Sequence, residues 1–442
     1  MRHDGRGSAQ TLRRGVVTMF VGRAFPPAAA LVTAPLLAVG LGVSGRGELA
    51  AATAPLLLAV TIAPVGMPTA VTYVVARSPR LFGVALRRGA VLTLLAGLVA
   101  VVVAVQAATL LSAGNETLAG YMVVAALAIV PTVLVALVQA GAAGLGRWRL
   151  IATERVVAAS VKVIAIVVLF ATGTLTVAAA VIVVAFAPVL GGLVYLGLRP
   201  PSVRGSGEPD AASEASARTA DLLRYGLRSW IGAVAGILLI RIDQLLFVPV
   251  GGAYELGLYA VAVTISEAPL IVNAAVRDVV FTHDAAKGDD ELLARASRMS
   301  TIATGAVALA IAATAWLWLP VLFGDDFRGA LVPLLVLLAA VVLGNPGSIA
   351  GTGLSARGRP GLRSISLVIA CVVNVAVFLA LVPVWGAAGA AIATLVGNLV
   401  SSNLNLVFLR RTSGISVGAF YAFRVADVRA VFALIPRAGG RT

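Results

Sequence analysis

Residues 319–398 read LPVLFGDDFRGALVPLLVLLAAVVLGNPGSIAGTGLSARGRPGLRSISLVIACVVNVAVFLALVPVWGAAGAAIATLVGN. Long apolar runs alternate here with short polar breaks, such as the acidic pair Asp325 and Asp326 and the basic segment 356–363. A helix that crosses a lipid bilayer needs about 20 predominantly apolar residues. This stretch therefore predicts membrane-spanning helices joined by short loops.

The same pattern extends along the whole chain. Of its 442 residues, 60% are hydrophobic and 12% are charged, whereas soluble domains carry about 25% charged residues. Twelve apolar segments of spanning length can be placed, at 16–42, 48–76, 89–111, 118–143, 151–172, 175–198, 226–250, 256–281, 299–323, 329–353, 364–384 and 386–409. The first is too long for the apolar region of a signal peptide. We therefore expect an all-α polytopic membrane protein of twelve transmembrane helices with almost no aqueous domain.

The basic residues are distributed unevenly among the loops. Of the 34 Lys and Arg residues, 29 lie in the N-terminal segment, in or beside the loops after every second span, and in the C-terminal tail. Loops rich in Lys and Arg remain on the cytoplasmic side. This predicts a multi-pass inner-membrane protein with both termini in the cytoplasm. The net charge of +15 then reflects topology and contact with lipid headgroups, so no nucleic-acid partner is expected.

A polar segment divides the chain into two similar halves. Residues 199–224 are rich in Pro, Gly, Ser and Ala, a composition typical of a flexible linker. At an offset of 210 residues, LLAVGLGVSGRG at Leu36–Gly47 falls on LFVPVGGAYELG at Leu246–Gly257. Because six helices precede the linker, the two copies have the same orientation, as in a parallel repeat.

The expected organisation follows from this division. It comprises an N-terminal six-helix lobe at 1–198, the cytoplasmic linker at 199–224 and a C-terminal six-helix lobe at 225–410. The tail at 411–442 contains Phe420, Phe423, Val428, Val431 and Ile435 at helical spacing. That spacing predicts an amphipathic helix lying at the membrane interface.

Two stretches resemble bacterial polysaccharide flippases (the O-antigen and teichoic type, Wzx-like), which share the MOP superfamily with MATE exporters and lipid II flippases. In RIDQLLFVPVGGAYELGLYAVAVTISE, the matching residues are Asp243, the pair at 251–252 and the Gly-x-Tyr-x-x-Ala pattern at 257–262. In the stretch at 319–398, they are Leu-Phe-Gly at 322–324, Ala-Arg-Gly-Arg at 356–359, Asn374, Val-Pro at 382–383 and the small residues at 386–391. The resemblance covers most of residues 15–410.

This resemblance implies a fold and a function. The fold would be two six-helix lobes related by a parallel pseudo-two-fold, as in MATE and other MOP proteins. The function would be translocation of an undecaprenyl-diphosphate-linked oligosaccharide from the inner to the outer leaflet by alternating access, for export of cell-surface polysaccharide. The implied partners are membrane lipids, the polyprenyl-diphosphate-linked saccharide, and candidate polymerases and glycosyltransferases. The implied transport is coupled to H⁺ or Na⁺ and needs no cofactor.

Three basic residues, Arg23, Lys162 and Arg241, lie inside predicted spans. A charged residue at the bilayer centre costs about 2.5–3.5 kcal/mol on insertion scales, and such residues commonly face a polar cavity. Guanidinium and ammonium groups both bind phosphate. We therefore predict that these cations bind the diphosphate. The alternatives are snorkelling of Arg23 and Lys162 to the interface, and an ion pair of Arg241 with Asp243 or another helix.

Two acidic residues, Asp243 and Glu267, also lie within predicted spans. A carboxylate in the membrane can bind a coupling proton or Na⁺ because desolvation favours its uncharged or cation-bound form. The alternative is an ion pair with one of the cations. On a helix, positions 241 and 243 point roughly 200° apart, so Arg241 and Asp243 must meet different partners.

Other function classes fit the sequence less well. One cysteine, Cys371, and two histidines, His3 and His283, cannot form a disulfide, a metal cluster or a catalytic triad. A MATE-like exporter of cationic drugs shares the expected fold, but its cavity should be acidic or aromatic. A membrane enzyme of polysaccharide synthesis would need a large external loop, and every predicted external loop is short. We therefore expect a transporter without catalytic residues or a metal site.

Overall fold

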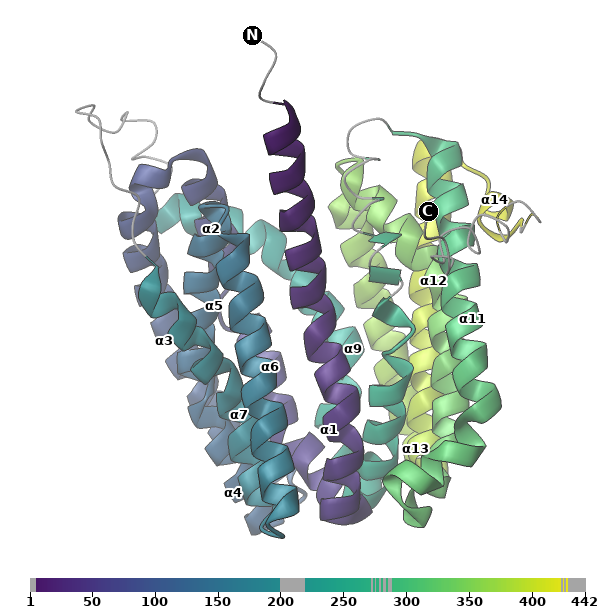
Figure 1. The fold of residues 1–442 in the computed structure, drawn as a ribbon. Helices are drawn as coiled ribbons and strands as arrows, with labels where there is room; N and C mark the ends of the chain where they lie inside the picture. Colours follow the sequence, from purple (N-terminus) through teal and green to yellow (C-terminus); the bar gives the residue numbers. More distant parts are fainter. Residues whose placement is uncertain are drawn as a thin grey trace, which may run out of the picture. The chain divides into compact units, whose positions relative to one another are not determined.

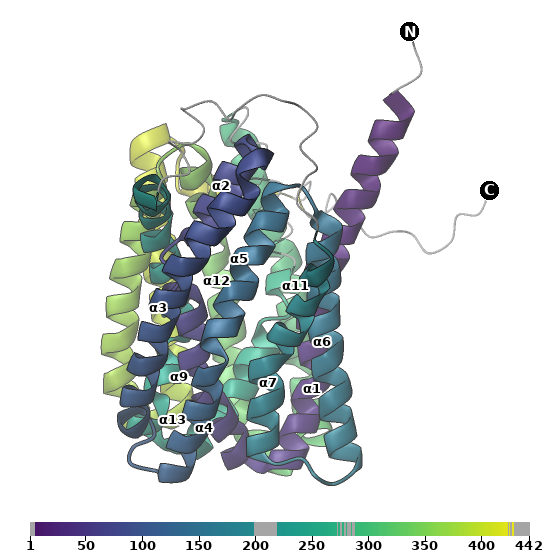
Figure 2. The ribbon, with the colours of Figure 1, turned by 90° about the vertical axis from the view of Figure 1, so that its left-hand side faces the viewer.

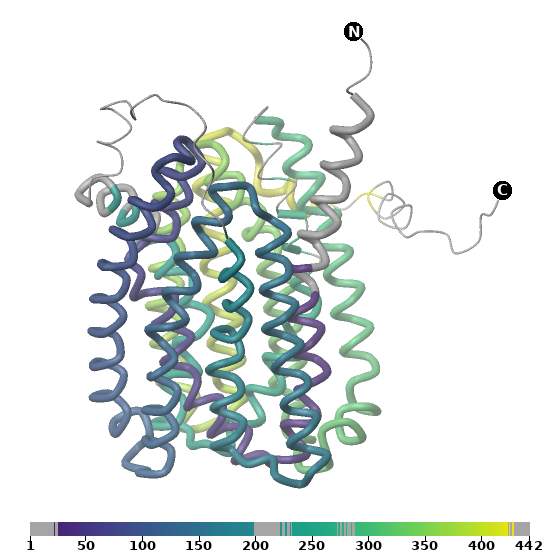
Figure 3. Tube along the Cα trace, turned by 60° about the vertical axis from the view of Figure 1, so that its left-hand side comes forward, coloured from purple at the N-terminus to yellow at the C-terminus, as the bar shows by residue number. Residues whose placement is uncertain are grey.

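The computed structural model describes residues 5–198 and 219–422, apart from 272, 275, 278, 279, 281–283 and 285–287, together with residues 424 and 427 (Figure 3). Every regular element in this part of the chain is helical. Eight helical stretches are long and apolar enough to cross a membrane: Phe25–Arg77, Pro79–Leu111, Glu116–Gly144, Val177–Gly197, Gly232–Ser266, Asp290–Phe323, Asp325–Ala356 and Pro360–Ser413. The predicted all-α, multi-pass membrane fold is confirmed, and the number of twelve spans stays a prediction.

The chain divides into two compact units. Unit 1 comprises Met1–Ile237 and Gln244–Gly257, and unit 2 comprises Leu238–Asp243 and Leu258–Thr442. Unit 1 contains α1 (Gly5–Ile62), α2 (Met67–Arg77), η1 (Pro79–Leu81), α3 (Phe82–Leu111), α4 (Glu116–Leu127), α5 (Ile129–Gly144), α6 (Trp148–Ala171), α7 (Val177–Gly192) and η2 (Leu193–Gly197). Helix α9 (Thr219–Ser266) contributes residues to both units. Unit 2 contains α11 (Asp290–Phe323), η3 (Asp325–Ala330), α12 (Leu331–Ala356), α13 (Pro360–Ser413) and α14 (Gly418–Tyr421).

The predicted lobe boundaries differ from this division. Residues 244–257 follow the predicted linker in sequence, yet they group with unit 1. Residues 199–218 of the predicted linker lie outside the described residues. The lobe boundaries at 198 and 225 therefore stay a prediction.

Within unit 1, the helices run alongside one another. Helix α1 packs along α6, α6 packs along α7, and α2 and α3 both pack along α5 (Figures 1 and 2). Two of the short loops end in a capping side chain. Asn115 accepts a hydrogen bond from the backbone N–H of Leu118 at 3.0 Å, and Thr176 accepts one from Ala179 at 3.2 Å. Such caps satisfy N–H groups at a helix start, so α4 and α7 begin directly at their loops.

Three of the long helices contain a glycine at which two helices meet at a kink. These glycines are Gly42 in α1 (φ 68°, ψ 179°), Gly252 in α9 (φ 79°, ψ 168°) and Gly386 in α13 (φ 51°, ψ −128°). A positive φ is accessible to glycine without the steric cost that other residues incur. Gly42 and Gly252 are separated by 210 residues, the offset of the predicted repeat, and their backbone conformations are nearly the same.

The two copies of this kink contact each other inside unit 1. A Cβ atom added to Gly47 would overlap the carbonyl oxygen of Ala253, and one added to Gly257 would overlap the carbonyl oxygen of Val43. Gly47 and Gly257 are equivalent in the repeat, as are Val43 and Ala253. Such a reciprocal contact is typical of two-fold symmetry, so the predicted parallel repeat is visible in the backbone.

Helix α3 presents an apolar face outward. Leu95, Val99 and Val102 lie one to two turns apart and are 56%, 63% and 60% exposed. In water, a continuous apolar face of this kind would favour association. In a bilayer it meets a solvent of its own polarity, which agrees with the membrane fold.

In unit 2, small residues bring α12 and α13 close together. A Cβ atom on Gly347 would overlap the backbone of Ser402. The Gly347 N–H donates to Ser402 Oγ at 3.0 Å, and Asn405 Nδ2 donates to the Gly347 carbonyl at 3.1 Å. The stripe formed by Gly389, Ala393, Gly397 and Ser401 is buried. Small residues let membrane helices approach closely, and here hydrogen bonds add to that packing.

The described part of the tail packs into unit 2. Its helix α14 covers only four residues, Gly418–Tyr421. Phe420 is 1% exposed and belongs to an apolar cluster with Leu293, Ile349 and Leu406. This part of the predicted interfacial helix therefore contacts protein, and residues 423 and 428–435 of the same prediction lie outside the described residues.

Candidate functional site

In unit 2, the predicted residues Arg241 and Glu267 form an ion pair. Arg241 Nη2 donates to Glu267 Oε1 at 3.1 Å. Arg241 lies in α9, and Glu267 directly follows the last residue of that helix, so the kink at Gly252 lies between them. The two side chains are 24% and 44% exposed, so the pair is only partly buried. The alternative in which Glu267 pairs with one of the cations therefore describes this structure.

Asp243 has a different partner, as its position on the helix predicts. Its side chain is buried, and it accepts a hydrogen bond from the hydroxyl of Tyr259. The Tyr259 hydroxyl also lies 3.0 Å from Thr394 Oγ1 in α13. Asp243 and Tyr259 come from opposite sides of the kink in α9. The kink thus folds two parts of one helix element together around a buried carboxylate.

Asn374 lies beside this group. It is 1% exposed, and among the described residues neither its amide oxygen nor its amide nitrogen has a hydrogen-bond partner. It packs against Gly397, which Leu239 also contacts. Leu239 precedes Asp243 by about one helical turn, and Gly397 follows Thr394 by about one turn. Asn374 therefore places a buried amide next to residues that lie one helical turn from Asp243 and from Thr394. The sequence singled it out through the family resemblance and as the repeat equivalent of Lys162 at an offset of 212 residues.

In unit 1, Lys162 and Arg46 interact electrostatically. Lys162 is half-buried in α6, and Arg46 in α1 is close enough to repel it. Lys162 forms no ion pair with a carboxylate among the described residues. The sequence predicts a loop between the spans 16–42 and 48–76, but the structure continues as helix through these residues. Arg46 lies inside α1, four residues after the kink at Gly42.

Arg23 lies in the first part of α1. Its side chain is outside the described part of the structure, so its predicted contact with substrate stays a prediction.

Unit 1 also contains a pocket that sequence reasoning missed. It has a volume of about 340 Å³, and the described residues that line it are Gly22, Pro68, Thr69, Thr72, Ala136, Gln139, Ala140, Ala143, Trp148, Ile151, Ala152 and Arg155. Behind it, Gln139 Nε2 donates to the buried carboxylate of Glu154 at 2.9 Å. In the sequence, Glu154 is next to basic residues whose position is explained by the positive-inside rule, so it did not stand out. Glu154 is the seventh residue of α6. An acidic residue at that depth in a helix was the signal that could have indicated a polar site here.

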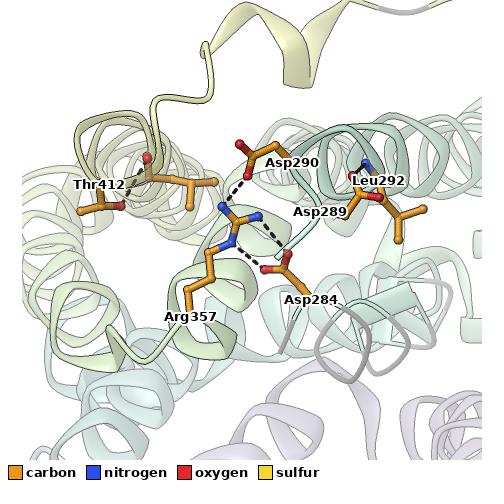
Figure 4. A network of polar contacts seen from close by, with 7 residues as sticks. Asp284, Asp289, Asp290, Leu292, Arg357 and Thr412 are labelled. Atoms are coloured by element: carbon orange, nitrogen blue, oxygen red, sulfur yellow. Dashed lines mark hydrogen bonds and ion pairs between the residues drawn. The ribbon is translucent and has the colours of Figure 1, made fainter. Parts of the chain in front are cut away.

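Basic residues of unit 2 bind acidic residues near the helix ends. Arg357, which follows α12, donates through Nε and Nη2 to both carboxylate oxygens of Asp284 at 2.9 Å, and through Nη1 to Asp290 at 2.6 Å (Figure 4). These hydrogen bonds raise the pKa of Arg357 further above its usual range. Bidentate pairs of this kind are among the stronger side-chain interactions. Arg357 therefore ties α11 to the end of α12, in addition to its predicted role in topology.

A second pair holds the tail. Arg298 of α11 donates through Nε to Asp427 at 2.7 Å and through Nη1 to the carbonyl of Ala419 at 2.7 Å. Both charged side chains are almost fully buried, at 5% and 3% exposure. The hydrogen bond from Arg298 lowers the pKa of the Asp427 carboxyl. The tail is thus attached to unit 2 by a buried ion pair.

The residues that the structure describes contain no cluster of three or more His, Cys, Asp or Glu side chains that could hold a metal ion. The polar groups brought together are cations in unit 1 and a carboxylate with hydroxyl groups in unit 2.

The chain matches one family and one fold. The family described as polysaccharide biosynthesis protein matches residues 12–281. No curated protein matches the chain. Among solved structures, it is similar to the lipid II flippase MurJ in an inward closed conformation, with 12% identity, a TM-score of 0.72, and coverage of 96% of this chain and 94% of that chain.

Two further solved structures agree. A multidrug resistance MATE family transporter of the MOP superfamily, inward-facing, has 16% identity and a TM-score of 0.63, with coverage of 89% of this chain and 99% of that chain. A MOP superfamily transporter from Pyrococcus furiosus has 15% identity and a TM-score of 0.57, with coverage of 89% and 93%. At these identities the likeness shows the fold. The solved neighbours are a flippase and two transporters. The chain belongs to the polysaccharide biosynthesis protein family.

Proposed function

We propose that this protein moves a polyprenyl-diphosphate-linked saccharide from the inner to the outer leaflet of the bacterial cytoplasmic membrane by alternating access. The undecaprenyl carrier, the inner-membrane location and the cytoplasmic termini are parts of this proposal. The family match supports a saccharide-bearing substrate, and the similarity to a lipid II flippase supports a lipid-linked one.

The observation that carries the proposal is the state of Lys162. An ammonium group inside an apolar helix is costly without compensation, and Lys162 forms no ion pair with a described carboxylate. The nearby charge of Arg46 adds repulsion. A dianionic diphosphate would relieve both costs, whereas a cationic drug would increase them. We therefore assign Lys162 and Arg23 to diphosphate binding and add Arg46 to this group.

We infer that ion coupling uses the carboxylates of unit 2. Asp243, Tyr259, Thr394 and Asn374 supply oxygen atoms that suit H⁺ or Na⁺, and Asp243 provides the negative charge. The partly exposed pair of Arg241 and Glu267 can respond to the same ions. Neutralisation of Glu267 by a proton or Na⁺ would release Arg241 to bind phosphate, which would link the coupling ion to the substrate.

A MATE-like exporter of cationic small molecules is the alternative function. The buried carboxylate of Asp243 and the MATE fold favour it. Drug sensitivity of a deletion strain separates the two, because a flippase deletion should change the surface polysaccharide without increasing the uptake of cationic dyes.

The test is replacement of Lys162. Lys162→Gln should decrease flipping of polyprenyl-diphosphate saccharide in proteoliposomes by at least tenfold, the equivalent of about 1.4 kcal/mol, and Lys162→Arg should retain most activity. The control is Arg87→Gln, because Arg87 is exposed near the start of α3. Normal flipping by Lys162→Gln would show that this lysine does not bind the substrate.

A further inference from the structure

The pocket of unit 1 has features of a ligand site that the proposed transport route does not use. Its volume of about 340 Å³ lies within the roughly 300–1,000 Å³ typical of small-molecule sites. Such sites are mostly apolar, with a few polar groups that orient the ligand. This pocket follows that pattern because alanine, glycine and proline form much of its described wall.

Three helices present the polar groups to the pocket. Trp148, Ile151 and Arg155 lie on one face of α6, since they are separated by three and four residues. Gln139 lies on the facing side of α5, and α2 contributes Thr69 and Thr72. Thr72 Oγ1 donates to the carbonyl of Ala140 at 2.9 Å, which fixes the hydroxyl so that its oxygen can accept a hydrogen bond from a ligand. The pocket thus combines an indole ring, an amide, two hydroxyls and a guanidinium.

The electrostatics of the pocket favour an uncharged ligand. Arg155 interacts with the neighbouring carboxylate of Glu154, and Gln139 is hydrogen-bonded to that carboxylate. The charges of Arg155 and Glu154 largely offset each other. A phosphate bound to Arg155 would meet the negative charge of Glu154, and a cation bound near Glu154 would meet Arg155. A polyhydroxyl ligand meets neither difficulty.

A sugar ring also has the hydrogen-bonding groups and the apolar faces that complement these side chains. Its rim of hydroxyls both donates and accepts hydrogen bonds, as the Gln139 amide and the threonine hydroxyls do. Its C–H faces are apolar, and the Trp148 indole is a flat apolar surface with a polar edge. Trp148 is 42% exposed, so its ring is accessible to a ligand.

We propose that this pocket binds one sugar residue of the lipid-linked saccharide, with Trp148 stacked on its apolar face and Gln139, Thr69 and Arg155 bound to its hydroxyls. This subsite rests on the proposed function. It lies in unit 1 and is distinct from the diphosphate-binding lysine, because Lys162 does not line the pocket. It would give the protein preference for glycosylated carriers over the bare lipid.

The experiment measures binding of two probes to the full-length protein in nanodiscs of phosphatidylethanolamine and phosphatidylglycerol. One probe is the polyprenyl-diphosphate saccharide fraction extracted from a strain that lacks this gene, and the other is undecaprenyl diphosphate. Wild-type protein should bind the glycosylated probe more tightly. Trp148→Leu should decrease that preference about tenfold, and Thr69→Val should decrease it severalfold. Neither variant should change the Kd for undecaprenyl diphosphate.

Trp316→Leu is the matched control, because Trp316 is 61% exposed on α11 of unit 2. It should keep the wild-type preference. The subsite is overturned if Trp148→Leu keeps the preference, or if it weakens both probes equally. A different result, in which wild-type protein binds neither probe, would instead contradict the proposed function.

Discussion

The two units treat buried charge in different ways. In unit 2, Arg241, Arg298 and Arg357 each contact a carboxylate at 3.1 Å or less. In unit 1, Lys162 has no such contact with a described residue and lies near a second cation instead. This difference supports the proposal that Lys162 of unit 1 binds an anionic ligand, whereas the ion pair of Arg241 in unit 2 must open before Arg241 can do so.

The units also differ in how their helices are joined. In unit 2, side-chain hydrogen bonds cross between α12 and α13 at Gly347, Ser402 and Asn405. In unit 1, α2, α5 and α6 leave a pocket between them, whereas a pocket of unit 2 lies beside α11, η3 and the start of α12, away from these hydrogen bonds. A dense, hydrogen-bonded helix pair resists deformation, whereas a pocket offers a ligand a place to bind.

The largest expected effect is on coupling. Asp243→Asn preserves the shape of the side chain but removes its charge, so cation-driven flipping should fall by a factor of at least 100, the equivalent of about 2.7 kcal/mol. The measurement is flipping in proteoliposomes with and without an imposed H⁺ or Na⁺ gradient. If flipping by this variant still depends on the gradient, Asp243 does not couple transport to the ion.

The next effect concerns the packing of α12 and α13. Gly347→Val would force the two helices apart, because its side chain would overlap the backbone of Ser402, and overpacking of a core typically costs about 1–3 kcal/mol or more. The thermal unfolding temperature in detergent should fall by several degrees. Gly120→Ala in α4, where a Cβ atom meets open space, is the control and should leave that temperature unchanged. An unchanged unfolding temperature for Gly347→Val would contradict the close packing of α12 and α13 at this glycine.

Attachment of the tail should depend on pH. The lowered pKa of Asp427 means that the folded tail favours the ionised carboxylate, so its contribution to stability is present above the usual Asp pKa and is lost as pH falls through the lowered value. Asp427→Asn should therefore detach the tail at neutral pH and increase its proteolysis severalfold. Equal cleavage rates for wild type and variant would contradict this prediction.

The smallest effect on stability should come from the partly exposed pair of Arg241 and Glu267. A double-mutant cycle with Arg241→Gln and Glu267→Gln should give a coupling energy below about 1 kcal/mol, because ion pairs that are only partly buried contribute little. Flipping should nevertheless be sensitive to both. If Glu267→Gln alone leaves flipping unchanged while its pair is broken, the proposed release of Arg241 by neutralisation of Glu267 fails.

The sequence alone determined the membrane fold and the repeat. Whether a segment enters a bilayer depends on its own length and apolarity, so spans can be recognised one at a time. The kinks at Gly42 and Gly252 occur at equivalent positions because a backbone that needs positive φ selects glycine locally. Helical geometry predicted that the side chains of Arg241 and Asp243 point in different directions and therefore meet different partners. These features depend on residues near each other in the chain.

Only the tertiary structure decided which groups meet. Asp243 and Tyr259 are joined by the kink in α9, and Thr394 comes from a helix more than 100 residues later. Arg46 lies within a helix because α1 continues beyond Gly42, and the pocket exists because α2, α5 and α6 leave space between them. Distances between such side chains depend on how helices pack, which no local pattern encodes. The composition of a span determines that it enters the membrane, and its neighbours determine what its polar residues do there.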